Sequence, residues 1–333
     1  MLNNLIFSLN ATLPVFLLMV LGMFLRRVGL LTEDFAGKMN SFVFKVSLPV
    51  LLFYDSAKNN FLSFFDGSYV LFCFFATAIE IAVSFFFAHF MKDRSEKGEF
   101  IQACFRSSAA LLGVVFAENI YGDTKILPLM ILGAVPLYNI MSVVILQIYQ
   151  PDRVQAPAAA AGEDGTKASS AGGLDRALVK QTLKGIVTNP IILGILAGLL
   201  WSLFRLPLPA ILDRTCDYVG RVASPLGLLA LGAQFDFRAA AKDLKPALFA
   251  SFMKLFGFAA VILPIAIHMG FLGEKLVSLI IMAGSPTTVT AFVMAKGFGH
   301  KGTLSASCVM LTTLISAFSL TLWVFLARTH GWL

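Results

Sequence analysis

Long apolar runs separated by short polar loops make up most of this chain. Ten of the runs suit membrane-spanning helices of roughly 20 residues, and they lie at about 3–25, 37–57, 67–91, 100–121, 124–149, 184–205, 210–234, 245–270, 273–297 and 302–328. Backbone groups in lipid need internal hydrogen bonds, and no run alternates like a barrel strand. The pattern therefore predicts an all-α polytopic membrane protein with ten transmembrane helices.

The first half of the chain is repeated in the second half. Three scarce residues recur 176 positions later, namely Pro14 as Pro190, Gly22 as Gly198 and Pro49 as Pro225. We therefore divide the chain into a first five-helix repeat (1–149), a linker (150–183) and a second five-helix repeat (184–333). A duplication of this kind inside the membrane is typical of transporters whose binding site lies between the halves.

The distribution of basic residues orients the spans. The loops after spans 1, 3, 5, 7 and 9 hold 16 Lys and Arg residues, whereas the other loops and the C-terminal tail hold 6. The excess on one side predicts that both termini lie outside the cytoplasm. Because each half has an odd number of spans, the second repeat enters from the opposite side, so the pair is inverted.

Composition supports this class and excludes others. Apolar residues form 58% of the chain and charged residues only 14%, against about 25% charged in a soluble domain. The Ala-, Gly- and Ser-rich stretch 156–173 reads as part of a flexible cytoplasmic linker. The net charge of +7 comes from loops between spans, so no nucleic-acid partner is expected. Enzyme motifs, metal clusters and cofactor signatures are absent from the sequence.

Span 9 contains the strongest candidate for a functional site. Pro286 follows Ser285 in mid-span and precedes Thr287 and Thr288, and a proline there removes a backbone hydrogen bond. A helix broken near the midplane presents dipole ends that suit an anionic group, although a proline kink satisfied by neighbouring helices is the plainer alternative. The partner span 4 has small polar residues at the same depth, Ser107 and Ser108.

Ionisable residues within spans are the other candidates. Glu80 in span 3 and Lys254 in span 8 lie at similar depth and can pair, either as an ion- or proton-coupling site or as a static brace. Arg106 begins the interrupted part of span 4, where it can attract an anion or bind freed carbonyl groups. Asn139 lies in span 5, close to these positions in the expected bundle.

Several short motifs resemble those of the auxin efflux carrier family, which includes bacterial members and the plant PIN proteins. Their order and spacing cover nearly the whole chain: Leu13-Pro14, Ser47-Leu48-Pro49, Phe105-Arg106-Ser107-Ser108, Asn189-Pro190, Ser224-Pro225, Ser285-Pro286-Thr287 and Ala295-Lys296. The family usually has Asn where Ser108 stands, and often a proline shortly after Gly113. The short central loop favours a bacterial member.

The resemblance implies a fold like that of sodium/bile-acid symporters, in which the broken helices 4 and 9 cross. It implies a scaffold of spans 1, 2, 6 and 7, a transport domain of spans 3–5 and 8–10, and an elevator-type movement. The family's substrates are organic anions. The family also has an acidic residue and a lysine behind the point where helices 4 and 9 cross, and Glu80 and Lys254 stand at matching positions.

These observations lead to one main hypothesis. The chain is expected to be a non-enzymatic secondary transporter for a small organic anion in the bacterial inner membrane, without a cofactor and with coupling to H⁺ or Na⁺ left open. The expected substrate contacts are Arg106, Ser107, Ser108, Asn139, Ser285, Pro286, Thr287 and Thr288. Besides substrate and lipid, a second copy of the chain is expected to bind through the scaffold helices. The alternatives are a ligand-sensing membrane receptor without net flux, and a channel.

Overall fold

The computed structural model describes residues 2–58, 66–109, 126–151 and 189–333, and the side chains of these residues from Leu13 onward. Within these ranges the chain is helical apart from loops and one isolated β-bridge. The linker from residue 152 onward and the second half of predicted span 4 lie outside the described residues. A helix lies within each of the ten ranges predicted as spans, and several of these helices are interrupted.

The first half of the chain contributes six described helices and one π-helical turn. In order they are α1 (Leu2–Arg27), α2 (Glu33–Phe42), the π-helical turn η1 (Val43–Ser47), α3 (Leu48–Lys58), α4 (Gly67–His89), α5 (Lys97–Phe105) and α7 (Leu127–Ile148). The helix α2 starts earlier than predicted because Thr32 caps it by accepting a hydrogen bond from Phe35 N.

The second half has a similar order of elements. These are α10 (Pro190–Leu203), α11 (Ala210–Arg221), α12 (Ala223–Gln234), α13 (Phe237–Lys242), α14 (Leu244–Phe252), the π-helical turn η2 (Met253–Gly257), α15 (Phe258–His268), α16 (Glu274–Gly284), α17 (Val289–Gly297) and α18 (Thr303–Thr329). The short helix α13 begins at Asp236, whose carboxylate accepts from two backbone N–H groups.

Four described helical stretches are long and apolar enough to cross a membrane. They are α4, α7, the continuous stretch Leu244–His268 and α18, and Pro190–Leu203 is a shorter apolar helix. The long helices are apolar on most of their surface, and many large apolar side chains on them are exposed, including Phe75, Ile79 and Phe318. Such faces suit lipid, so the protein is an integral membrane protein.

Prolines account for the irregular turns in predicted spans 2 and 7. Pro49 has no N–H to donate to the carbonyl of Lys45, four residues back. Just before it, Leu48 N donates to Val43 O, five residues back, which makes this turn π-helical. At the equivalent place before Pro225, the helix stops at Val222 and restarts as α12. Repeat-related prolines therefore interrupt both spans at matching positions.

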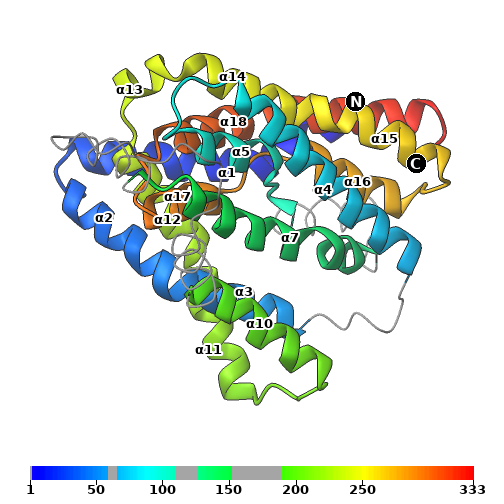
Figure 1. Cartoon of the computed structure of the whole chain (residues 1–333), viewed down its shortest axis with the longest axis horizontal. Coiled ribbons are helices and arrows are strands. Elements are labelled where there is room, and N and C mark those ends of the chain that lie inside the picture. The colour runs from blue at the N-terminus through cyan, green and yellow to red at the C-terminus, as the bar shows by residue number, and fades with distance from the viewer. Residues whose placement is uncertain (1, 59–65, 110–125, 152–188) are drawn as a thin grey trace, which may run out of the picture.

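Glycines allow two pairs of helices to approach closely. A Cβ added to Gly22 in α1 would collide with the carbonyl oxygen of Leu229 in α12, and one added to Gly198 in α10 would collide with that of Phe53 in α3. Leu229 and Phe53 are themselves 176 residues apart, as are the two glycines. The same backbone contact is thus made once between α1 and α12 and once between α3 and α10 (Figure 1).

The apolar core divides into two main clusters. The larger takes its buried residues from α4, α5, α7, α14–α16 and α18, with Tyr69, Phe105 and Leu279 among them. The second joins α1, the α2–α3 region, α10 and α12 to α7, α17 and the first part of α18. The elements of predicted spans 1, 2, 6 and 7 contribute nothing to the described part of the larger cluster.

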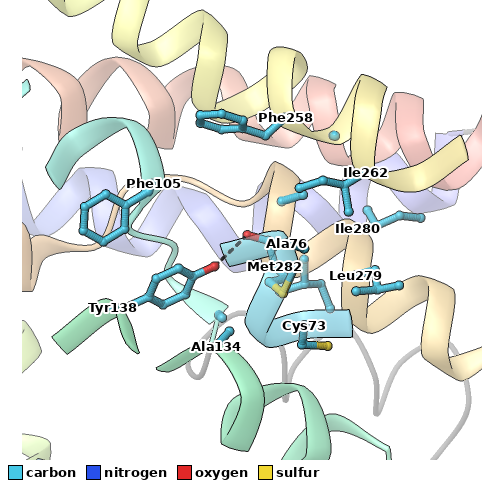
Figure 2. Packing of buried hydrophobic residues seen from close by; sticks show 14 of the residues in the cluster. Cys73, Ala76, Phe105, Ala134, Tyr138, Phe258, Ile262, Leu279, Ile280 and Met282 are labelled. Atoms are coloured by element: carbon cyan, nitrogen blue, oxygen red, sulfur yellow. Dashed lines mark hydrogen bonds between the residues drawn. The ribbon is translucent and has the colours of Figure 1, made fainter. Parts of the chain in front are cut away.

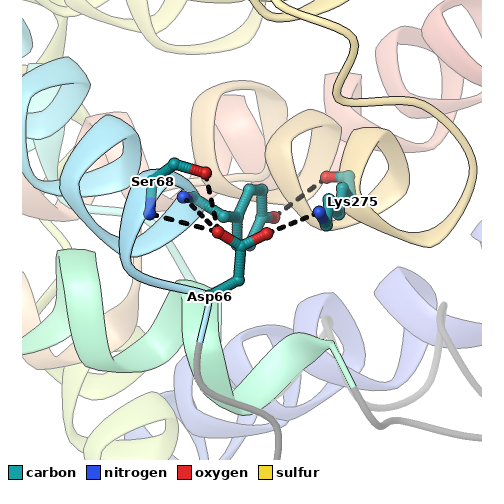
Figure 3. A network of polar contacts seen from close by, with 4 residues as sticks. Asp66, Ser68 and Lys275 are labelled. Carbon is teal, nitrogen blue, oxygen red and sulfur yellow. Dashed lines mark hydrogen bonds and ion pairs between the residues drawn. The ribbon is translucent and has the colours of Figure 1, made fainter.

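A polar network joins the starts of α4 and α16 (Figure 3). Asp66 caps α4 by accepting from Ser68 N and Tyr69 N, and its other oxygen lies 2.6 Å from Lys275 Nζ. The Lys275 ammonium holds the pKa of Asp66 well below its usual range, with the Ser68 and Tyr69 hydrogen bonds acting in the same direction. Two helices that are distant in sequence are thereby fixed at one end.

The glycine contacts give a stability prediction. Gly22→Ala and Gly198→Ala should each lower the free energy of unfolding by about 1–3 kcal/mol, because a methyl group must displace a packed helix. Gly37→Ala in α2 is the matched control, since nothing lies within 4 Å of its added Cβ. This control should be neutral or stabilising by about 0.5–1 kcal/mol. Thermal unfolding in detergent measures the three variants, and equal effects would contradict the close-contact interpretation.

Candidate functional site: the crossing of two broken helices

The ends of two helices meet in the interior of the protein. The helix α5 ends at Phe105 and α16 ends at Gly284, and each is followed by extended backbone. The extended segments pair through an antiparallel bridge between Ser107 and Thr287, with Ser108 N donating to Pro286 O at 2.9 Å. The structure thus brings together the two segments that the sequence singled out, and we call this region the crossing.

Pro286 explains the break in α16. The carbonyl of Met282 would accept from the N–H of residue 286 in a regular helix, and proline has none. Three side chains donate to this carbonyl instead: Ser107 Oγ, Lys254 Nζ at 3.2 Å and Tyr138 OH at 3.4 Å. Figure 2 shows the hydrogen bond from Tyr138. The carbonyl that proline leaves free therefore joins residues from η2, α7 and the extended segment after α5.

The end of α5 is satisfied in the reciprocal way. Thr287 Oγ1 donates to Ala103 O at 2.8 Å, while Thr287 N donates to Thr312 Oγ1 in α18 at 3.0 Å. Each broken helix therefore has one of its last carbonyls capped by a hydroxyl from the opposite segment. Ser285 Oγ is buried and has no hydrogen-bond partner among the described residues, so within this part of the chain one hydroxyl at the crossing is left free.

Arg106 lies at the centre of the crossing. Its side chain is only 4% exposed, and its Nε donates to Thr290 Oγ1 at 3.0 Å. Its terminal nitrogens donate to Ser142 Oγ at 2.8 Å, Asn139 Oδ1 at 2.5 Å and Tyr138 O at 3.4 Å. All of these partners are neutral, so the guanidinium has no carboxylate partner among the described residues.

Arg106 also lies next to the start of α17. Its partner Thr290 is the second residue of that helix, and Thr290 Oγ1 in turn contacts Thr288 Oγ1 at 3.3 Å. The N-terminal end of a helix carries partial positive charge. The cation and the helix end together make this side of the crossing favourable for a negatively charged group.

Glu80 and Lys254 do not form the direct ion pair that the sequence allowed. Lys254 is fully buried and donates to Met282 O and to Ala283 O at 3.4 Å, where its charge faces the negative end of α16. Glu80 is also fully buried, and in the described part of the chain neither carboxylate oxygen has a hydrogen-bond partner. The freed carbonyls of α16 compete for the ammonium group, which explains the difference.

Some residues of the site were not identified from sequence. Ser142 and Thr290 bind Arg106, and Thr312 binds the backbone of Thr287. Ser142 lies three residues after Asn139 and hence on the same face of α7, a spacing that could have indicated it. Glu99 was also missed; its buried carboxylate accepts from Gly302 N and Ser305 N and caps α18.

Ser107 and Pro286 should show energetic coupling, because both act on Met282 O. Ser107→Ala should cost about 0.5–1.5 kcal/mol in the wild-type background. In a Pro286→Ala background residue 286 regains its N–H, so the same change should cost less. Thermal or denaturant unfolding of the four proteins measures the coupling as a double-mutant cycle.

Ser305→Ala is the matched control for this cycle, since Ser305 Oγ is buried without a hydrogen-bond partner. It should show no coupling to Pro286→Ala. Additive effects of Ser107→Ala and Pro286→Ala would contradict the shared role of the Met282 carbonyl.

Comparison with known proteins places this geometry in context. Residues 7–324 match a family described as membrane transport protein. The chain is 23% identical to the uncharacterized transporter YfdV of Escherichia coli, over 97% of this chain and 98% of that one. It is 21% identical to an uncharacterized transporter of Methanothermobacter thermautotrophicus, over 95% and 97%.

One solved structure resembles the fold. It is the sodium proton antiporter MjNhaP1 from Methanocaldococcus jannaschii at pH 8, with a TM-score of 0.58 and 14% sequence identity. The likeness covers 91% of this chain and 92% of the other. At this level of identity it bears on the fold alone, which is that of a polytopic membrane transporter.

Proposed function

Since this chain belongs to the membrane transport protein family, the auxin efflux carrier family that its motifs resemble, we propose that it is a secondary transporter for a small organic anion. The substrate is a mono- or dicarboxylate, and one carboxylate binds at the crossing. The observation that carries this proposal is Arg106, a buried cation whose described partners are all neutral. Removing a charge from water without an opposite charge is costly, and an anionic substrate would compensate it.

The other predicted site residues have distinct roles in this proposal. Asn139 orients Arg106, and Ser107 and Thr287 hold the two broken ends together. Ser285, whose hydroxyl has no partner, and Thr288, at the cap of α17, are available to the substrate. Ser108 and Pro286 supply the backbone pairing between the segments.

We further propose that the molecule is built from ten spans in two inverted repeats and moves as an elevator. The repeat-related contacts of Gly22 and Gly198 support the inverted arrangement. The larger core cluster, which draws on none of the predicted scaffold spans, supports a separately packed transport domain. Glycine at these contacts keeps the scaffold helices close together, as a rigid support requires.

A homodimer through the scaffold helices belongs to the same proposal. Two repeat-related patches on predicted spans 2 and 7 are exposed: Phe42, Lys45 and Val46, and Tyr218, Arg221 and Val222. Both valines are 40% exposed, and Arg221 pairs with Asp217 at 2.8 Å. Charged groups halfway along a span are costly in lipid, which supports a protein partner on this face. We also propose that the protein lies in the bacterial inner membrane with both termini outside the cytoplasm.

Uptake into proteoliposomes tests the assignment of Arg106. Arg106→Gln should lower the uptake of labelled small carboxylates by roughly 10- to 100-fold, which corresponds to the loss of a charged hydrogen bond. Arg106→Lys should recover only part of it, because ammonium lacks the planar fork. Arg238→Gln, on the exposed start of α13, is the matched control and should transport normally.

Thermal unfolding of each variant separates loss of binding from loss of folding. Full uptake by a folded Arg106→Gln protein would overturn the site. Binding without saturable counterflow in the wild type would instead favour a receptor without net flux, and flux that does not saturate would favour a channel.

Glu80 is proposed to couple transport to H⁺ or Na⁺, because its carboxylate is buried and none of the residues that the structure describes forms a hydrogen bond with it. Glu80→Gln mimics the protonated acid, so accumulation driven by an ion gradient should be lost while exchange of labelled for unlabelled substrate continues. Glu33→Gln, at an exposed carboxylate of α2, is the control. Unchanged gradient-driven accumulation by Glu80→Gln would contradict the coupling role.

A further inference from the structure

A cavity lies between α15, α16 and α18, and none of the crossing residues is among its described lining. Its volume is about 410 Å³. Each helix contributes apolar side chains to its walls, for example Leu263 from α15, Leu276 from α16 and Ala327 from α18. Two histidines line it at the helix ends, His268 on α15 and His330 on α18. Pro264 lies in the wall within α15. The cavity is therefore apolar along the helices and polar at the helix ends.

The polar side chains that line this cavity carry no negative charge. No acidic residue is among its described lining. The His330 ring stacks on Trp332 with centroids 4.6 Å apart, and its Nδ1 lies 2.9 Å from Leu326 O. Because a carbonyl oxygen only accepts, Nδ1 is the donor in this contact, and the other ring nitrogen of His330 is left to a ligand, as a donor when the ring is protonated. Indole and imidazole rings at helix ends are typical of the membrane–water interface.

Trp323 separates the cavity from the crossing. Its indole Nε1 donates to Leu255 O at 2.9 Å, so its polar group is satisfied while its ring lines the cavity. Leu255 belongs to the turn η2, directly after Lys254. A Cβ added to Gly284 at the end of α16 would lie 3.3 Å from Trp323 Cδ1. The inner wall of the cavity is thus built on the elements that hold the broken helix.

We propose that this cavity binds one acyl chain of a membrane phospholipid, with the phosphate group near His268 and His330. The stretch Leu244–His268 and α18, which form two of its walls, are long and apolar enough to cross the membrane. Lipid hydrocarbon is the apolar ligand available around such helices, and protonated imidazole rings, which donate from both nitrogens, bind phosphate oxygens. The site is separate from the crossing and does not depend on the proposed substrate.

Tryptophan fluorescence tests this site directly, because two of the chain's three tryptophans line the cavity. Trp201→Phe with Trp332→Phe leaves Trp323 as the sole emitter. The protein is reconstituted into phosphatidylcholine vesicles with ordinary or brominated acyl chains, and bromine quenches indole on contact. An acyl chain in the cavity should remove most of the Trp323 emission, and equal emission in the two kinds of vesicle would overturn the proposal.

Cavity-filling variants separate the cavity from general contact with lipid. Ala327→Phe, or Leu276→Phe from the opposite wall, should restore Trp323 emission in brominated vesicles. Thr329→Phe is the matched control on the exposed surface of α18, outside the lining, and should be quenched like the parent. Equal quenching in the parent and both filled variants, each folded by thermal unfolding, would show that lipid reaches Trp323 without using the cavity.

Discussion

The candidate site depends on one missing backbone N–H group. Pro286 leaves the Met282 carbonyl without its helical donor, and this buried acceptor must be satisfied. Ser107, Tyr138 and Lys254 donate to it from three different elements. A local defect in one helix therefore determines where α5, α7 and η2 lie, and so where Arg106 is held.

Two other sets of contacts hold the helices around this break in place. On one side, repeat-related glycines let α1 approach α12 and α10 approach α3, backbone against backbone. On the other side, two residues of α18 form hydrogen bonds: Thr312 with the segment after α16, and Trp323 with the turn η2. Glu99 caps the start of α18. The crossing is fixed by hydrogen bonds to side chains, because its backbone has left the helical pattern.

Features with strong local physical effects predicted the all-helical membrane fold. Prolines and glycines at a constant spacing predicted the repeat, and the structure has matching interruptions before Pro49 and Pro225. Pro286 predicted the break in α16. The contacts that the sequence did not predict depend on which of several nearby groups in the folded protein forms the hydrogen bond. Lys254 binds freed carbonyls and not Glu80, and Ser142 and Thr290 reach Arg106 from different helices; helix periodicity indicates a face but not which partner wins.

An experimental structure with a brominated small carboxylate tests the central claim most directly. Anomalous scattering from bromine locates the ligand without assuming its pose. The account predicts a peak at the crossing, with the carboxylate beside Arg106 and the first residues of α17. A saturable ligand whose bromine lies elsewhere, for example in the cavity beside Trp323, with the crossing occupied only by protein side chains, would contradict it.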